Sequence, residues 1–211
     1  MRITKFEHAC VRVEHDGQVL VIDPGSFTRR EAVSGATAVL ITHEHADHYD
    51  LEHLRATDAP IYTIGAVARQ IGDADPSLAE RVTVVAPGQR LDVGLPVQVV
   101  GEKHAVIHPE LPHFDNSGFL VTAGDRTLFH PGDAFTDPGQ PVDVLCLPVS
   151  APWSKLSEVL DYARSTKATH YFAIHEMIYS EIALSMVDAR VPAMLDGTGS
   201  YARLQPGSDL G

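Results

Sequence analysis

The sequence predicts an α/β (α+β) protein, a sandwich of mixed β-sheets with helices on the outer faces. Three observations predict this fold: an antiparallel hairpin opens the chain, many short apolar strands follow, and two βαβ-like units close it. Where helices alternate with groups of strands, both faces of each sheet must be covered. A sandwich of two sheets with outer helices is the simplest arrangement that covers them. Because no repeat, low-complexity tract or linker divides the sequence, we expect one domain over residues 1–211.

The first half of the chain is predicted to be mostly strand. Asp16-Gly17 lies between two apolar segments, which is a strong hairpin signal. Residues 36–42 form a continuous β-branched run and should be buried on both faces of a sheet. The hydrophobic pattern predicts further strands at 60–64, 82–85, 89–93 and 97–102, a helix over 65–72 and another beginning near Leu51.

The second half is predicted to alternate between strands and helices. Residues 117–130 indicate a second hairpin, turning at Gly124-Asp125. Two βαβ-like units follow, and the tail 206–211 is expected to be frayed. The predicted elements are strands at 142–149, 169–175 and near 200–206, with helices over about 154–166 and 180–190.

Composition and charge exclude several classes of protein. The 16 Lys and Arg against 28 Asp and Glu give a net charge of −12, which repels polyanions, so nucleic acid is an unfavourable partner. The chain shows no secretion signal and no run of 18 apolar residues, so we expect a soluble cytoplasmic protein without a membrane partner. Cys10 and Cys146 both lie in apolar strands and are expected to be core residues.

The motif His43-Glu44-His45-Ala46-Asp47-His48 follows the apolar strand that ends at Thr42. A lone histidine would favour a solvated loop, but four ligand-type side chains together favour a metal site. His43 and His45 are two positions apart and can present nitrogens to one point, while Asp47 and His48 can address a second point. Imidazole and carboxylate suit Zn²⁺, Mn²⁺, Fe²⁺ or Ni²⁺, and the absence of cysteine argues against a structural zinc site.

Three more candidate ligands stand at other strand ends. They are His104, Asp133 and His175, and each follows an apolar strand. Alone, either histidine is better explained as an ordinary loop or core residue, and Asp133 is equally well explained as a turn residue after Pro-Gly. The histidine motif and these three residues would then all lie at one edge of the sheets.

The order of these motifs resembles the metallo-β-lactamase fold superfamily. The motifs on which the resemblance rests are "THEHADH", a lone His after a strand, "GD" after a hairpin and "IH" late in the chain. The segment "EHACVRVEHDGQVLVIDPG" resembles the compact branch with the L-ascorbate-6-phosphate lactonases and many uncharacterised metal-dependent hydrolases. The resemblance covers about residues 3–203.

This resemblance implies a four-layer αβ/βα sandwich with two divalent metal ions at one edge, Zn²⁺ first among the candidates. Asp23 would support the site, and His8 would lie close to the metals and contact substrate. The implied ligands are His43, His45 and His104 for one metal and Asp47, His48 and His175 for the other, with Asp133 bridging. The chain departs from the pattern at Ala134, where Thr is common, and in "PVSAPWSK" (148–155), which puts substrate contacts of that segment in doubt.

Two ions about 3.5 to 4 Å apart can share a water and lower its pKa, which gives a hydroxide near pH 7 that attacks a carbonyl or phosphoryl centre. Asp47 can protonate the leaving group by proton relay, and His108 and His113 are further candidates. Both histidines lie in a loop over 103–116, where we expect specificity to be decided, although surface histidines are an equal alternative. Tyr49 and Trp153 are compatible with packing or with recognition.

The sequence therefore favours a metal-dependent hydrolase acting on a small molecule such as a lactone, ester or phosphoester. One alternative is a phosphodiesterase or RNA-processing nuclease, against which the net charge stands. A second alternative is a non-hydrolytic iron or metal-binding redox module. A β-lactamase is disfavoured by the absence of an export signal, and a homo-oligomer stays open.

Overall fold

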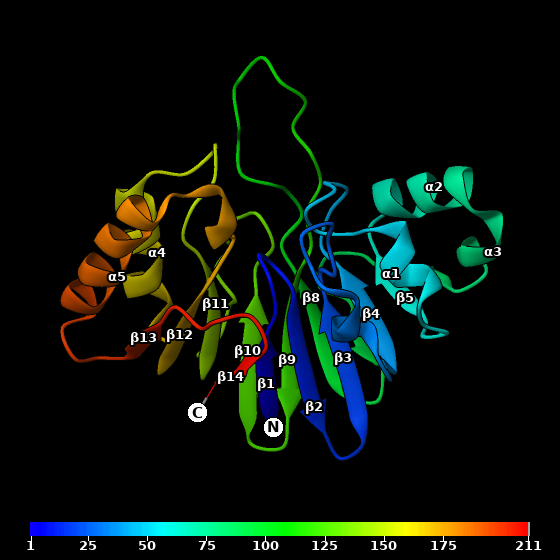
Figure 1. The fold of residues 1–211 in the computed structure, drawn as a ribbon, viewed down its shortest axis with the longest axis horizontal. Coiled ribbons are helices and arrows are strands. Elements are labelled where there is room, and N and C mark those ends of the chain that lie inside the picture. The colour runs from blue at the N-terminus through cyan, green and yellow to red at the C-terminus, as the bar shows by residue number, and fades with distance from the viewer. Residues whose placement is uncertain (211) are drawn as a thin grey trace.

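The computed structural model describes residues 1–210. Two seven-stranded mixed sheets pack face to face, and helices cover both outer faces (Figure 1). In Figure 1, α1, α2 and α3 flank one sheet while α4 and α5 flank the other. The predicted four-layer sandwich of two mixed sheets is confirmed.

The first sheet has the order β14-β1-β2-β3-β4-β5-β6. Its N-terminal strands are antiparallel, and β3 to β6 are parallel to one another. The Asp16-Gly17 turn joins β2 to β3 with both residues at positive φ, as the Asp-Gly signal predicts. The strands are β1 (Arg2–Lys5), β2 (Val11–His15), β3 (Gln18–Ile22), β4 (Ala38–Ile41), β5 (Ile61–Thr63), β6 (Val82–Val84) and β14 (Ser208–Asp209).

The second sheet has the order β13-β12-β11-β10-β9-β8-β7. Its hairpins pair β7 with β8, β8 with β9 and β9 with β10, while β10 to β13 run parallel. The parallel strands contain the two predicted βαβ units. The strands are β7 (Arg90–Asp92), β8 (Pro96–Val100), β9 (Gly118–Ala123), β10 (Arg126–His130), β11 (Val144–Pro148), β12 (His170–Ile174) and β13 (Ser200–Ala202).

The helices lie on the connections between parallel strands. Asp50 caps the helix after the histidine motif by accepting from Glu52 N at 2.8 Å, and so marks where the motif loop ends. The helices are α1 (Leu51–Arg55), α2 (Gly65–Ala74), α3 (Pro76–Ala79), α4 (Leu156–Thr166) and α5 (Glu181–Leu195), with 3-10 turns η1 (Arg30–Val33) and η2 (Glu176–Ile178). Within residues 1–210, none of these helices has the length and apolar character that a membrane span requires.

The three largest apolar clusters hold the layers together. The central one joins the inner faces of both sheets and includes Val13 and Leu40 from the first and Phe119 from the second. A second cluster packs α4 and α5 on the outside of the second sheet, and a third packs α1 to α3 on the first. Cys10 and Cys146 are free and buried, as core residues should be. Burial on both faces therefore explains the continuous apolar run of β4, which is fully buried.

Two expectations about the second half of the chain were wrong. The tail was expected to be frayed, but β14 pairs with β1, and Asp209 accepts from Thr4 Oγ1 at 2.6 Å and Arg2 Nε at 2.9 Å. A strand edge offers unpaired backbone groups that a polar tail can satisfy, which local composition cannot reveal. The last helix was expected to end at residue 190 but continues to Leu195 with Pro192 inside it. Its buried residues Val191 and Leu195 extend the packed face past the proline.

Candidate metal centre

The predicted ligand residues stand where strands end, at one edge of the two sheets. The histidine motif follows β4, His104 follows β8, Asp133 follows β10 and His175 follows β12. The loop between β8 and β9 projects beyond the same edge in Figure 1. The two sheets therefore deliver side chains far apart in the sequence to one place.

These side chains form two groups of possible metal ligands. Within each group, one ligand atom from every member lies within 4.8 Å of the others. Every residue proposed as a ligand from the sequence belongs to one group or the other. The groups are His43, His45, His104 and Asp133, and His8, Asp47, His48 and His175.

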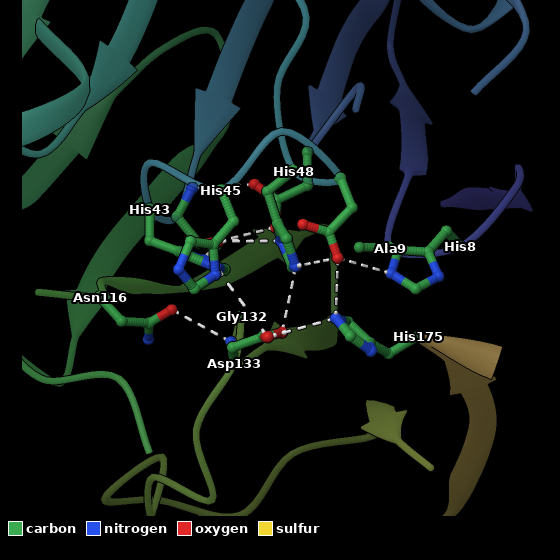
Figure 2. A network of polar contacts seen from close by, with 12 residues as sticks. His8, Ala9, His43, His45, His48, Asn116, Gly132, Asp133 and His175 are labelled. Atoms are coloured by element: carbon green, nitrogen blue, oxygen red, sulfur yellow. Dashed lines mark hydrogen bonds and ion pairs between the residues drawn. The ribbon is translucent and has the colours of Figure 1, made fainter. Parts of the chain in front are cut away.

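Asp133 lies between the two groups (Figure 2). Its Oδ1 is 3.1 Å from His48 Nε2, in the second group. Its Oδ2 is 3.2 Å from His175 Nε2 and 3.4 Å from His104 Nε2, so this oxygen faces both groups. A carboxylate in this position can be shared by two cations, as the resemblance to the superfamily implied.

Three of the histidines have one ring nitrogen fixed by an acceptor. Because each acceptor is a carboxylate or a backbone carbonyl, Nδ1 carries a proton, which leaves Nε2 as the ring nitrogen that can turn to a metal. This is the orientation that a metal-ligating histidine takes. The pairs are His48 Nδ1 with Asp23 Oδ2 at 2.7 Å, His104 Nδ1 with Ala105 O at 2.5 Å, and His175 Nδ1 with Ser150 O at 2.6 Å.

The same three Nε2 atoms and Asp133 Oδ1 are buried and make no hydrogen bond. His48 Nε2 and Asp133 Oδ1 are 3.1 Å apart, but their relative orientation is not that of a hydrogen bond. Buried polar atoms without partners are costly, and a cation between them would satisfy all of them at once. The nitrogen and oxygen donors of the two groups therefore fit a pair of divalent ions such as Zn²⁺, Mn²⁺ or Fe²⁺.

Asp23 holds the motif in place from behind. Its carboxylate accepts from Thr42 N at 2.8 Å, Thr42 Oγ1 at 2.7 Å and His48 Nδ1 at 2.7 Å, all of them buried. Thr42 Oγ1 also lies 3.0 Å from His43 Nδ1. One carboxylate thus connects the end of β3 to two histidines of the motif, which matches the supporting role expected of it.

Within residues 1–210, three of the six non-glycine residues at positive φ lie at this centre. His8, Asp23 and His175 have φ of 55°, 51° and 64°, in the left-handed region that costs energy for residues with a side chain. Glycines permit close approaches nearby. A Cβ on Gly25 would lie 1.9 Å from Asp47 O, and a Cβ on Gly132 would lie 2.2 Å from Asn116 Oδ1. The chain thus pays a local conformational cost to place these side chains.

The charges of the centre depend on how its histidines and carboxylates are paired. Burial opposes protonation of His175, but the carboxylates of Asp133 and Asp47 outweigh it and raise its pKa to about 9. Burial likewise opposes the charge on Asp133, yet His48 and His175 hold its pKa well below the usual range. For His8, burial dominates and lowers the pKa to about 4, so this ring is neutral near pH 7.

His8 reaches the second group more directly than expected. Its Nε2 is 3.0 Å from Asp47 Oδ2, its ring centroid is 4.0 Å from that of His175, and its Nδ1 is buried without a hydrogen-bond partner. The resemblance to the superfamily placed His8 close to the metals and in contact with substrate. Its place in the group adds a possible ligand or proton-carrying role.

The structure does not bring His108 and His113 to the ligand groups. Both are exposed in the loop over 103–116. His113 Nε2 donates to the carbonyl of His104 at 2.7 Å, and His108 Nδ1 accepts from Glu110 N at 3.2 Å. Their role in catalysis or specificity stays a prediction.

The two ambiguous aromatic residues have different surroundings. Tyr49 OH donates to Gln70 Oε1 at 2.5 Å and so connects the motif loop to α2. Trp153 Nε1 donates to Asp133 Oδ2 at 3.0 Å, and its ring lies 5.1 Å from that of Phe135. Trp153 therefore belongs to the centre as well as to the packing around it.

Asn116 is a supporting residue that the sequence did not reveal. Its Oδ1 accepts from Asp133 N at 3.1 Å (Figure 2). Its Nδ2 donates to Pro131 O at 2.9 Å. These bonds fix the loop that carries Asp133. No spacing or periodicity marks Asn116, because it stands at the end of a long irregular loop.

Comparison with known proteins identifies the family. A family model described as "Beta-lactamase superfamily domain" matches residues 2–175. Protein Rv0786c of Mycobacterium tuberculosis is 38% identical over 205 residues, covering 92% of each chain. A UPF0173 metal-dependent hydrolase of Pyrobaculum arsenaticum is 29% identical over 146 residues, covering 63% of this chain and 61% of its own.

Solved structures show the same fold. The metallo hydrolase Igni18 of Ignicoccus hospitalis superposes with a TM-score of 0.74 at 20% identity, over 99% of this chain and 97% of its own. The chain belongs to the metallo-β-lactamase superfamily, as its motifs predicted.

Proposed function

We propose that this protein is a metal-dependent hydrolase that holds two divalent ions and cleaves a small molecule at a carbonyl or phosphoryl centre. The observation that supports it most is the convergence of buried, unpartnered ring nitrogens on a shared carboxylate. Relatives of this chain are named metal-dependent hydrolases, which agrees with the proposal.

The proposed ligands follow the two groups. His43, His45 and His104 would hold one ion and Asp47, His48 and His175 the other, with Asp133 shared, and Zn²⁺ suits these donors best. Two ions bound here would supply Lewis acidity toward the oxygen under attack and would lower the pKa of a bound water toward neutrality.

The chain's own residues would orient the site and handle protons. Asp23, Ser150 and Ala105 hold three imidazoles with Nε2 inward. Burial opposes the charge of Asp47, but the close contacts of its carboxylate with the rings of His175 and His8 keep its pKa below the usual range, so it is a carboxylate at neutral pH. His8 and Asp47, 3.0 Å apart, form a pair that can carry a proton toward a leaving group.

Metal content and turnover of Asp133→Ala test the proposal. The variant should lose at least one ion and nearly all turnover while staying folded, because the three apolar clusters lie in the strands and helices. Asp125→Ala, in the exposed turn between β9 and β10, is the matched control and should keep both. Full activity with two ions in Asp133→Ala would remove the shared-ligand assignment.

The wild-type protein distinguishes the alternatives. A metal-loaded sample is screened against esters, lactones, thioesters, phosphodiesters, sugar phosphates and single-stranded RNA. Hydrolysis with two redox-inert ions supports the proposal. One iron per chain with oxygen consumption would establish the redox alternative, and salt-sensitive binding and cleavage of RNA would establish the nuclease.

A further inference from the structure

Three partly exposed aromatic side chains stand beside the ligand groups. They come from three separate segments: the loop after β3, the loop between β8 and β9, and the turn after β11. Phe27 is 47% exposed, and Phe114 and Trp153 are half-buried. Their ring centroids lie 5.1 Å from His8 for Phe27, 4.8 Å from His45 for Phe114, and 5.8 Å from His104 for Trp153.

These rings offer apolar surface where a substrate must sit. An apolar or aromatic group bound beside the ligands would be covered by ring faces and edges, which contribute beyond simple area burial. Exposed Val106 and Leu111 of the loop between β8 and β9 add to the apolar character of this edge.

Each of the three segments also carries a cation, and each cation is paired with a carboxylate. Within residues 1–210, the ion pairs of Asp47 and Asp133 are all with histidines. Phosphate recognition ordinarily uses Arg or Lys aimed at the anion. The pairs are Arg29 with Glu7 at 2.6 Å, Lys103 with Asp115 at 2.5 Å, and Lys155 with Glu158 at 3.7 Å.

The surrounding charge also disfavours an anionic substrate. The chain carries a net charge of −12, and Glu44 stands between His43 and His45 with a buried, unpartnered Oε2. Apart from the proposed ions themselves, a phosphorylated substrate would approach against this field.

We infer that the substrate is an uncharged carboxylic ester or lactone whose apolar or aromatic group packs against Phe27, Phe114 and Trp153. The inference rests on the proposed hydrolysis and narrows it. Water adds across the acyl C–O bond: its oxygen bonds to the acyl carbon, the bond to the alkoxide oxygen breaks, and one water proton ends on the alcohol. The carboxylic acid formed then releases its own proton to solvent.

Three esters with one leaving group test the substrate class in the zinc-loaded protein. They are 4-nitrophenyl acetate, 4-nitrophenyl hexanoate and mono(4-nitrophenyl) adipate, which differ only in a short, an apolar or an anionic acyl chain. After correction for hydrolysis without protein, kcat/KM for the hexanoate should exceed that for the adipate by roughly tenfold, because a charge would have to leave water. Equal or faster turnover of the adipate would overturn the inference.

Substitutions of the two phenylalanines test where the apolar group of the substrate binds. Phe27→Ala and Phe114→Ala should each lower the hexanoate-to-acetate ratio roughly 2- to 10-fold, and the Leu variants should retain most of it. Ile182→Ala, on α5 and 78% exposed, is the control and should leave the ratio unchanged. Unchanged ratios in both Phe→Ala variants would also overturn the inference.

A binding measurement separates this inference from the proposed function. Trp153 is the only tryptophan of the chain, so its emission reports on ligands placed beside it. Hexanamide should change the emission of the zinc-loaded protein at lower concentration than phenyl phosphate does. If no compound of the hydrolysis screen is cleaved, the proposed function fails, and this titration still decides the substrate class, since tighter binding of phenyl phosphate contradicts an uncharged substrate.

Discussion

The indole Nε1 of Trp153 donates a hydrogen bond to Oδ2 of Asp133 across 3.0 Å. This oxygen faces histidines of both ligand groups, so the indole fixes the carboxylate that two ions would share. Partners of this kind that orient a ligand typically affect metal affinity by about 10- to 100-fold.

Trp153→Phe should therefore weaken metal binding by about tenfold or more, because it removes the donor and keeps a ring beside Phe135. Competition with a chromophoric chelator measures the affinity. Phe135→Leu, which keeps the indole N–H, should change it far less. Equal affinity of Trp153→Phe and wild type would show that the hydrogen bond does not position Asp133.

Gly25→Ala should disrupt the centre by displacing the backbone of the histidine motif. The new Cβ would meet Asp47 O at 1.9 Å and His48 N at 2.7 Å, so the motif backbone must move. We expect a loss of metal affinity together with a destabilisation of roughly 1–3 kcal/mol, as for other overpacked sites.

Denaturant unfolding and chelator competition measure these two effects. Gly72→Ala is the matched control, because its Cβ would have 3.8 Å to the nearest atom and lies in α2. Wild-type stability and metal affinity in Gly25→Ala would contradict the close approach.

Metal affinity should fall as the pH falls. In the metal-free protein, burial opposes protonation of His175, but Asp133 and Asp47 raise its pKa to about 9, so Nε2 holds a proton at neutral pH. A cation must displace that proton, and binding therefore strengthens as the pH rises toward about 9 and weakens below it.

Proton release on metal loading is measurable by calorimetry in buffers with different ionisation enthalpies. At least one proton per chain should be released at pH 7. Binding without proton release, with affinity independent of pH between 6 and 9, would show that His175 is not displaced from its proton.

His113→Ala should change substrate preference or rate without loss of metal. The side chain donates to the carbonyl of His104, in an exposed loop next to a proposed ligand. Steady-state kinetics over the ester series and metal analysis of the same sample measure both properties. If neither kinetics nor metal content changes, this loop does not determine specificity through His113.

The positions of the candidate ligands were predictable because they follow local rules. His43 and His45 are two residues apart after a buried strand, and their rings do converge, with Nε2 and Nδ1 3.0 Å apart. A two-residue hairpin turn requires positive φ at two consecutive positions, and Asp16-Gly17 adopts it readily. Such signals depend on a few neighbouring residues, so they survive in the sequence alone.

The parts that escaped prediction depend on contacts between distant segments. Asp209 joins β14 to β1 across more than 200 positions, and nothing in the tail's composition indicates it. Asn116 supports Asp133, and Phe27 and Phe114 flank the histidines, only because irregular loops fold next to one another. Loops of this kind carry no periodicity from which their neighbours can be read.

The metal content of the purified chain tests the central claim most directly. Protein reconstituted with Zn²⁺ and desalted is measured by native mass spectrometry beside an apo sample. We predict two ions per chain in the wild type, which would satisfy the buried Nε2 atoms of His48, His104 and His175. A reconstituted wild-type chain that retains no ion, or whose zinc content is unchanged when these three histidines are replaced together, would contradict the account.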